Sequence, residues 1–471
     1  MISLNQPLDI NQDPVEAEKF LSSLQGNILK SHGRSHAAHL ILRFKTDAAS
    51  VTKAKQWIAE FARTQITSAQ DQRKTTVLWK APANQDHCGE LFAMFLLSPT
   101  GYGALGLDPS RPPDGFFQGG MQGDGELSED GPRESRDAPY NGDVHAMVLL
   151  AHGCLDPLNE AAAYVEAELK SFCDVVHKEQ GKKLQQPMDG KLITIEHFGY
   201  ADGVSQPLMI KEDIDDEVAK RGNAHWDPAA SLNLALVEEQ PGSQTYGSYM
   251  VFRKLEQNVR LFKDRTEQLA DQMGLTGTDR PLAGALAVGR HKDGTPVIPT
   301  TVVQPDAFPN DFNYDNDADG KVCPFHAHIR KSNPRGDLSR RPVNPVPLEI
   351  EKRFRIVRRG ITYGERPDLA SDLPGSVQPP ETGVGLLFMS FQANLGQFTI
   401  QQGGSDSNDF VRPGVGVDAI IGRNDNPTPQ TWPTPGSETP FTMANLVSFK
   451  GGEYFFAPSL PFLRGLDANG A

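Results

Sequence analysis

The chain has 471 residues, of which 38% are hydrophobic and 23% are charged, a composition that is ordinary for globular proteins and excludes disordered or collagen-like chains. Its formal net charge of −14 argues against a nucleic-acid or anionic-membrane partner, because an acidic protein repels phosphate groups. The length predicts two domains, or one large domain built from two similar halves.

Strands and helices are predicted in alternation along the chain. Short apolar runs predict strands, and apolar residues at three- and four-residue steps predict helices. The expected strands are 38–44, 75–80, 91–97, 145–153, 248–255, 355–364, 385–393 and 444–456. Helices are expected at 159–179 and 256–274, the second ending at Gly274.

A polar segment, 211–233, separates two stretches that have a similar order of strands and helices. We therefore expect an N-terminal domain at 1–215 and a C-terminal domain at 235–471. Long segments rich in proline and glycine occur in both halves, and ordered loops of such length are usually functional.

The four cysteines are far apart in the sequence and form no C-x-x-C pair, which predicts neither a disulfide framework nor a thiolate zinc site. The N-terminus has no basic region followed by an apolar run, and no segment reaches the roughly 18 apolar residues that span a membrane. These patterns favour reduced thiols, a cytoplasmic location and no membrane partner. The cysteines are Cys88, Cys154, Cys173 and Cys323.

The segment 322–337 places two histidines beside a cysteine and several basic residues. Three interpretations fit these residue types. The segment is an ordinary surface loop, or Cys323, His326 and His328 bind zinc. Alternatively, one histidine is the axial ligand of a haem iron, and Arg330 and Lys331 supply the positive charge that meets the haem propionates. The residue types alone do not decide among the three.

Two other segments carry candidate catalytic residues. In 197–207, Asp202 lies between glycines in a G-x-x-D-G pattern, where the backbone can turn sharply and a ligand can approach closely, although most Asp-Gly pairs only form turns. In 354–366, Arg358 and Arg359 follow apolar strand residues. Adjacent strand residues point to opposite faces, so at most one of these arginines faces a buried site.

Together these segments resemble the dye-decolorizing peroxidases, and the length resembles the larger branch of that family, which has fungal and bacterial members. The similar motifs are G-x-x-D-G at Gly199–Gly203, C-P-F-x-A-H at Cys323–His328 and I-V-R-R-G-I-x-Y-G at Ile356–Gly364. The resemblance covers most of the chain, from QGNILKSHGR through GSYMVFRKLEQNV to GGEYFFAPS.

The resemblance implies an α+β fold of two ferredoxin-like modules with antiparallel sheets, with haem b mainly in the C-terminal module. It implies that His328, at the sixth position of C-P-F-x-A-H, is the axial iron ligand, and that His326 occupies a position where the family usually has a small residue. It also implies that Asp418, in GVDAIIG, accepts the N–H of the axial histidine.

The distal residues that the resemblance implies are Asp202 and Arg358, with Arg359 facing away. Leu387 and Met389 are expected to form the wall of the distal pocket, because alternate strand residues share a face. Asp202 would accept and return the peroxide proton, and the permanently protonated Arg358 would stabilise the developing negative charge.

The implied activity is the reduction of hydrogen peroxide with oxidation of aromatic donors, namely anthraquinone-type dyes and phenols. Two alternatives stay open at this point. One is a haem-binding or haem-handling protein whose peroxidase activity is incidental, and the other is a zinc metallohydrolase. The sequence leaves the oligomeric state open, a homo-oligomer included.

Overall fold

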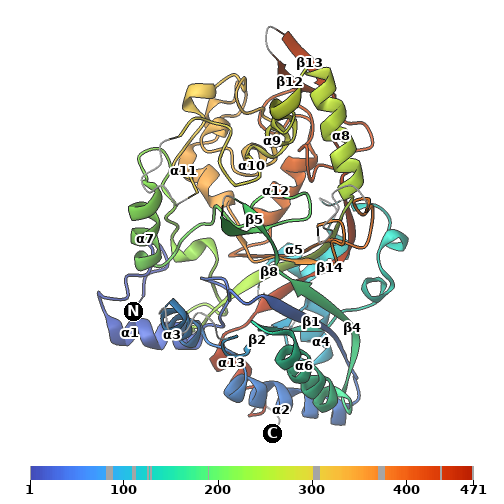
Figure 1. The fold of residues 1–471 in the computed structure, drawn as a ribbon. Helices are drawn as coiled ribbons and strands as arrows, with labels where there is room; N and C mark the ends of the chain where they lie inside the picture. Colours follow the sequence, from blue (N-terminus) through green and yellow to red (C-terminus); the bar gives the residue numbers. More distant parts are fainter. Residues whose placement is uncertain are drawn as a thin grey trace.

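The computed structural model describes residues 2–80, 88–108, 113–124, 127, 130–188, 190–300, 308–369, 377–434 and 437–468. Figure 1 shows a central sheet with α2 and α6 below it and α8, α9 and α10 above it. The helices are α1 (Pro14–Ser23), α2 (Ala48–Thr64), α3 (Ala69–Lys80), α4 (Pro99–Ala104), α5 (Gly115–Gly119), α6 (Leu155–Leu169), α7 (Lys211–Arg221), α8 (Val259–Gln272), α9 (Leu282–Val288), α10 (His328–Ser332), α11 (Leu348–Glu351), α12 (Gly396–Asp406) and α13 (Leu460–Arg464).

The strands of the two halves have the same spatial order. In the N-terminal half the antiparallel order is β2-β3-β1-β4, and in the C-terminal half it is β10-β11-β8-β14. Each is a β-α-β-β-α-β arrangement, with α2 and α6 in the first half and α8 and α12 in the second. The strands are β1 (His36–Phe44), β2 (Phe92–Leu97), β3 (Ala146–His152), β4 (Cys173–Lys182), β8 (Tyr246–Gln257), β10 (Ile361–Tyr363), β11 (Gly385–Gln392) and β14 (Val447–Ala457), with shorter β5 (Leu184–Met188), β6 (Lys191–Ile195), β7 (Val237–Glu238), β9 (Val357–Arg358), β12 (Gln430–Thr434) and β13 (Ser437–Phe441).

The two halves share one sheet, because β14 pairs with β2 through Phe456 and Leu97. The two ends of the strand order also meet. The Thr362 hydroxyl on β10 donates to the carbonyl of Lys182 on β4 and accepts the N–H of Leu184 at 3.0 Å. The expected α+β class is confirmed, whereas the division at 1–215 and 235–471 stays a prediction.

Each face of the sheet packs into a different apolar core. Leu40 of β1 and Val148 of β3 pack with α2 and α6, whereas the neighbouring residues Ile41 and Leu149 point to the opposite face. That second core also contains the inner face of the C-terminal strands, including Leu387 of β11. The alternation of side chains along each strand therefore decides which residues face the core and which face the other side.

Two predicted elements are wrong in type or length. The predicted strand 75–80 is the end of α3, although its Thr-Thr-Val run favours strands; the hydroxyls of Thr75 and Thr76 donate to carbonyls four residues earlier, within the helix. The predicted helix 159–179 ends at Leu169, and β4 begins at Cys173. The predicted helix stop at Gly274 is confirmed, with φ of +69°.

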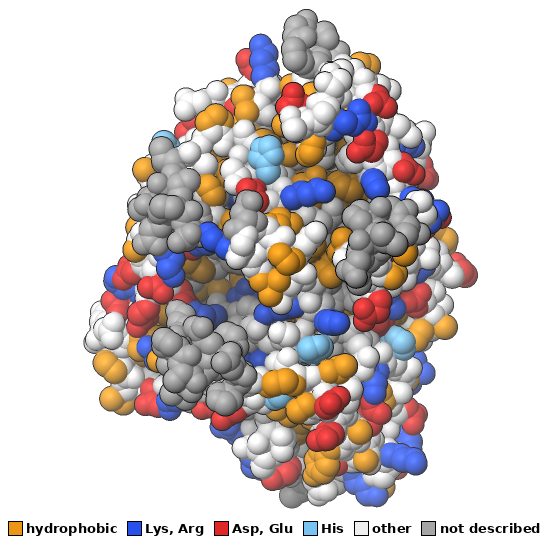
Figure 2. Space-filling view, viewed as in Figure 1, with side chains coloured by type: hydrophobic (Ala, Val, Ile, Leu, Met, Phe, Trp, Pro, Cys, Tyr) orange, Lys and Arg blue, Asp and Glu red, His pale blue; other side chains and the backbone are white. Residues whose placement is uncertain are grey.

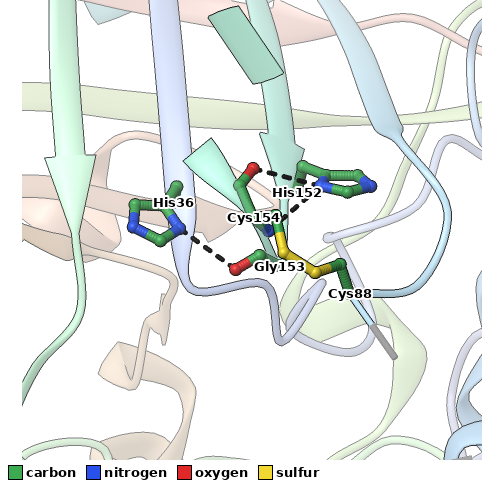
Figure 3. The surroundings of a disulfide bond; sticks show 5 residues. All are labelled: His36, Cys88, His152, Gly153 and Cys154. Carbon is green, nitrogen blue, oxygen red and sulfur yellow. Dashed lines mark hydrogen bonds between the residues drawn. A yellow bond between two sulfur atoms is a disulfide. The ribbon is translucent and has the colours of Figure 1, made fainter. Parts of the chain in front are cut away.

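Cys88 and Cys154 form a disulfide, which corrects the expectation of reduced thiols for these two residues, whereas Cys173 and Cys323 are free (Figure 3). Their Cα atoms are 5.4 Å apart, inside the usual range for disulfides. The bond joins the segment before β2 to the end of β3, where His152 Nδ1 accepts the N–H of Cys154 at 3.0 Å. Nothing in the sequence indicated the pair, because the two cysteines are 66 positions apart along the chain.

Candidate active site

A cavity lies between the outer face of β8 and β11, the loop that contains G-x-x-D-G, and helices α10 and α12. Of the residues predicted to form the site, Asp202, His328 and Arg358 line it. On the surface, Figure 2 shows acidic and basic side chains interspersed over the face in view. The convergence of these three residues, far apart in the sequence, makes this cavity the candidate active site.

His328 is held by a buried carboxylate. It begins α10, and its Nδ1 lies 2.9 Å from Oδ2 of Asp418, which is 0% exposed. Asp418 Oδ1 also accepts the backbone N–H groups of Ile420 and Ile421 at 2.8 and 3.0 Å. Because the carboxylate accepts the Nδ1 proton, Nε2 is left as the free nitrogen of the ring, which is the arrangement that a metal-binding imidazole needs.

The ionisation of this pair follows from its surroundings. Burial lowers the pKa of His328, but the charge and hydrogen bond of Asp418 outweigh burial and raise it. Burial raises the pKa of Asp418, but His328 and the two backbone N–H groups outweigh burial and lower it. Asp418 is therefore ionised at neutral pH and serves as a fixed hydrogen-bond acceptor.

His326 lies outside the cavity, although it is only two residues from His328. Its ring packs edge-on against Trp432, with centroids 4.4 Å apart, and burial lowers its pKa to about 3. The zinc alternative needs Cys323 and both histidines to converge. Among the described residues, no group of three or more potential ligands of this kind surrounds a common point.

Asp202 and Arg358 are close together but not tightly paired. Gly199 and Gly203 have φ of +92° and +74°, so the turn around Asp202 needs glycine. Arg358 Nη1 lies 4.0 Å from Asp202 Oδ1, and the two side chains are 37% and 33% exposed. Arg358 Nη2 donates to the carbonyl of Ser205 at 3.0 Å, which orients the guanidinium next to the carboxylate.

Arg359 points away from the cavity, as expected for a neighbour of Arg358 on a strand. Its guanidinium is buried and donates to the carbonyls of Asn27 and Ile28 at 2.8 and 3.0 Å. Burial lowers its pKa to about 9, with a smaller contribution from Arg358. This arginine fixes the N-terminal segment against β9.

Three predicted cofactor contacts are wrong. Arg330 is 0% exposed and forms ion pairs with Asp317 and Asp337, so it is not available to the cavity. Leu387 and Met389 face the core between the two halves of the sheet. Leu386 and Phe388 line the cavity instead, because the expected strand was assigned the opposite face.

Arginines missing from the prediction line the cavity. Arg335 donates to Asn310 and Phe312 carbonyls at 2.8 and 2.7 Å, and burial lowers its pKa to about 9. Arg355 donates to backbone carbonyls, and burial lowers its pKa to about 10. Neither forms an ion pair among the residues that the structure describes. No signal in the sequence singles out these two arginines, since arginine is frequent on any protein surface.

The cavity fits a haem. A haem needs one neutral imidazole nitrogen and cationic groups for its two propionates, in an otherwise apolar space. His328 provides the nitrogen, Arg335 and Arg355 provide positive charge without a carboxylate partner, and Leu386 and Phe388 provide apolar walls.

The chain is similar to known proteins over nearly its whole length. A multifunctional dye peroxidase from Amycolatopsis sp. is 37% identical over 99% of this chain and 100% of its own length. A dye-decolorizing peroxidase from Mycetinis scorodonius is 31% identical over 78% of this chain and 74% of its own length. No protein-family model matches the chain.

Solved structures agree with these relatives. A DyP-type peroxidase from Anabaena sp. has a TM-score of 0.86 and 38% identity, covering 98% of this chain and 97% of its own. The Amycolatopsis structure has a TM-score of 0.87 at 36% identity, covering 98% and 100%. The chain therefore belongs to the dye-decolorizing peroxidase family, haem-dependent oxidoreductases that use peroxide as electron acceptor.

Proposed function

We propose that this peroxidase binds haem b through His328 Nε2 and oxidises anthraquinone-type dyes and phenols with hydrogen peroxide. The observation that carries the proposal is the His328–Asp418 hydrogen bond of 2.9 Å in the same cavity as Asp202 and Arg358. Relatives named dye-decolorizing peroxidases, and a solved relative in complex with 2,6-dimethoxyphenol, support these substrate classes.

The bound haem would supply the redox chemistry that takes electrons from the donor and passes them to peroxide. Asp202 takes the proton from one peroxide oxygen and returns it to the other, directly or through one water. The Nη donors of the Arg358 guanidinium hold the peroxide and stabilise the charge that develops on the departing oxygen. Asp418 keeps the proton on Nδ1 of His328.

The test is reconstitution with haemin, followed by the absorption spectrum and peroxide-dependent dye oxidation. His328→Ala should lose the Soret band and the activity, whereas His326→Ala should keep bound haem, because His326 lies against Trp432 outside the cavity. Unchanged haem binding and turnover in His328→Ala would contradict the assignment of His328 as the residue that holds the haem.

A haem-handling function is a second candidate, because deferrochelatases from Yersinia species are 26% identical to this chain over 48% of it and 40% of their own length. The distal pair of Asp202 and Arg358 favours turnover of peroxide instead. A haem that survives many peroxide cycles supports the peroxidase, and iron released from intact porphyrin supports the alternative.

Three further proposals concern the molecule as a whole: two domains at 1–215 and 235–471 with haem mainly in the second, a cytoplasmic location, and a homo-oligomer. The redox state of Cys88 and Cys154 tests the cytoplasmic location, because disulfides persist in oxidising compartments. Within the described residues, no helix is long and apolar enough to cross a membrane. Alkylation of thiols at cell lysis, followed by mass spectrometry, would decide the redox state, and light scattering the oligomeric state.

A further inference from the structure

A second carboxylate, Glu196, lies in the wall of the cavity close to Asp202. It follows the last residue of β6, Ile195, at the start of the turn that leads to G-x-x-D-G. Its carboxylate accepts the backbone N–H of Phe198 at 2.8 Å and of Tyr200 at 3.0 Å. One side chain therefore accepts two backbone N–H groups, two residues apart, in the turn that precedes Asp202.

The main chain of Glu196 closes the same turn. Its N–H donates to the carbonyl of Tyr200 at 3.1 Å, and its carbonyl accepts the N–H of Gly199 at 3.0 Å. The next hydrogen bond joins Asp202 N–H to Thr194 carbonyl at 3.1 Å, so Asp202 lies at the exit of this closed turn. The position of the Asp202 carboxylate therefore depends on a turn whose inner amides are satisfied by Glu196.

A residue of the other half of the chain fixes Glu196 in turn. Gln257, the last residue of β8, is 5% exposed and donates its side-chain N–H to Glu196 Oε2 at 2.5 Å. The amide oxygen of Gln257, Oε1, is buried and has no hydrogen-bond partner within the part of the chain that the structure describes. No Lys or Arg forms an ion pair with Glu196 among the residues that the structure describes, so hydrogen bonds alone hold it.

We infer that Glu196 and Gln257 are positioning residues for the distal acid: they hold the turn 196–200 so that Asp202 meets the peroxide proton. This inference rests on the proposed role of Asp202. A misplacement of about 1 Å at a reacting group can cost about a hundredfold in rate. Glu196 touches no reacting atom in this scheme, so its effect passes through Asp202.

The experiment measures two steps separately on the haem-loaded enzyme. Stopped-flow absorption after mixing with hydrogen peroxide gives the rate constant of the peroxide step, and the later reaction with a phenol gives the donor step. Glu196→Ala should slow the peroxide step by about 10- to 100-fold and leave haem content, the Soret maximum and the donor step unchanged. Glu196→Gln should lose less, because its amide oxygen still accepts one N–H, and Gln257→Leu should fall between the parent and Glu196→Ala.

The double variant separates a positioning role from an independent one. If Glu196 acts through Asp202, Asp202→Ala with Glu196→Ala should be within about twofold of Asp202→Ala alone. Hydrogen exchange gives a readout that needs no turnover: the amides of Phe198 and Tyr200, which donate to Glu196, should exchange faster in both Glu196 variants. Glu238→Gln is the matched control, since this carboxylate accepts the N–H of Gln244 in the hairpin of β7 and β8 and does not line the cavity.

Multiplicative losses in the double variant, or a normal peroxide step in Glu196→Ala with haem bound, would overturn the inference. If Glu196→Ala fails to bind haem, Glu196→Gln and Gln257→Leu decide, and a normal peroxide step in both overturns it. An unaffected Asp202→Ala variant would instead overturn the proposed role of Asp202, so the two failures are distinguishable.

Discussion

The two candidate groups in the cavity differ in how firmly they are held. His328 is bonded to Asp418, whose carboxylate is 0% exposed and accepts three hydrogen bonds. Asp202 and Arg358 are each about one third exposed and separated by 4.0 Å. A metal ligand works best with one fixed orientation, whereas a group that accepts and returns a proton must remain free of a tight ion pair. The difference in packing therefore matches the difference in proposed role.

The largest effect is expected at the loosely held side. Asp202→Ala should slow the peroxide step by about 10²- to 10⁴-fold, because it removes the proton acceptor. Bound haem and the free energy of unfolding should stay close to those of the parent, since the Asp202 side chain is one third exposed and its contact with Arg358 is long, at 4.0 Å. Stopped-flow kinetics and denaturant unfolding measure the two quantities. A large loss of stability in Asp202→Ala would show that the loose side is structural after all.

The adjacent arginines sharpen the comparison, because Arg358 lines the cavity and Arg359 does not. Arg358→Leu should slow the peroxide step by about 10²- to 10³-fold with little change in stability. Arg359→Leu should lower the free energy of unfolding by about 1–3 kcal/mol, because the carbonyls of Asn27 and Ile28 lose their donor. The opposite pattern, in which Arg359→Leu slows the peroxide step and keeps the parental free energy of unfolding, would mean that the arginine facing the cavity has been assigned incorrectly.

A moderate effect is expected at the firmly held side. Asp418→Asn keeps the shape of the side chain but removes the charge that fixes the Nδ1 proton of His328. Removal of such a partner typically lowers metal affinity or activity by about 10- to 100-fold. Haem titration followed at the Soret band measures the affinity. An Asp418→Asn enzyme with parental haem affinity and parental peroxide kinetics would refute this role.

The smallest effect on catalysis is expected far from the cavity, at the disulfide. Cys88→Ser should lower the free energy of unfolding by about 4 kcal/mol in the loop-entropy estimate, because the bond closes a loop with a sequence separation of 66. The peroxide step should be unchanged. Cys154→Ser is the matched control and should lose the same stability; unequal losses would indicate that one cysteine has another role.

The sequence motifs predicted residues that meet at one site in the structure, whereas the strand pattern predicted the wrong residues of β11 for the cavity wall. Asp202, His328, Arg358 and Asp418 were placed by motif position, and the structure brings them to one site. Leu387 and Met389 were one residue out of phase, and in a strand such a shift reverses the face.

Contacts between distant segments gave no local signal. Arg253 of β8 binds Asp130, 123 residues earlier, with Nη1 2.8 Å from Oδ2, and Arg423 pairs with the same carboxylate. The burial of the pair raises the pKa of Asp130, but Arg253 and Arg423 outweigh it and lower the pKa. Spacing along a chain cannot reveal such a partner, because a pairing at this separation depends on the sheet order.

Because β10 and β4 meet, the two halves of the chain depend on each other when they are expressed as separate fragments. In the whole chain, the Thr362 side chain joins the two ends of the strand order, and β14 pairs with β2 at the junction of the two halves. A fragment that ends in the polar segment 211–233 would expose β2 and β4 as free edges, which invite strand addition between molecules. Each half expressed alone should therefore aggregate. When the two halves are produced together, they should associate into one folded complex.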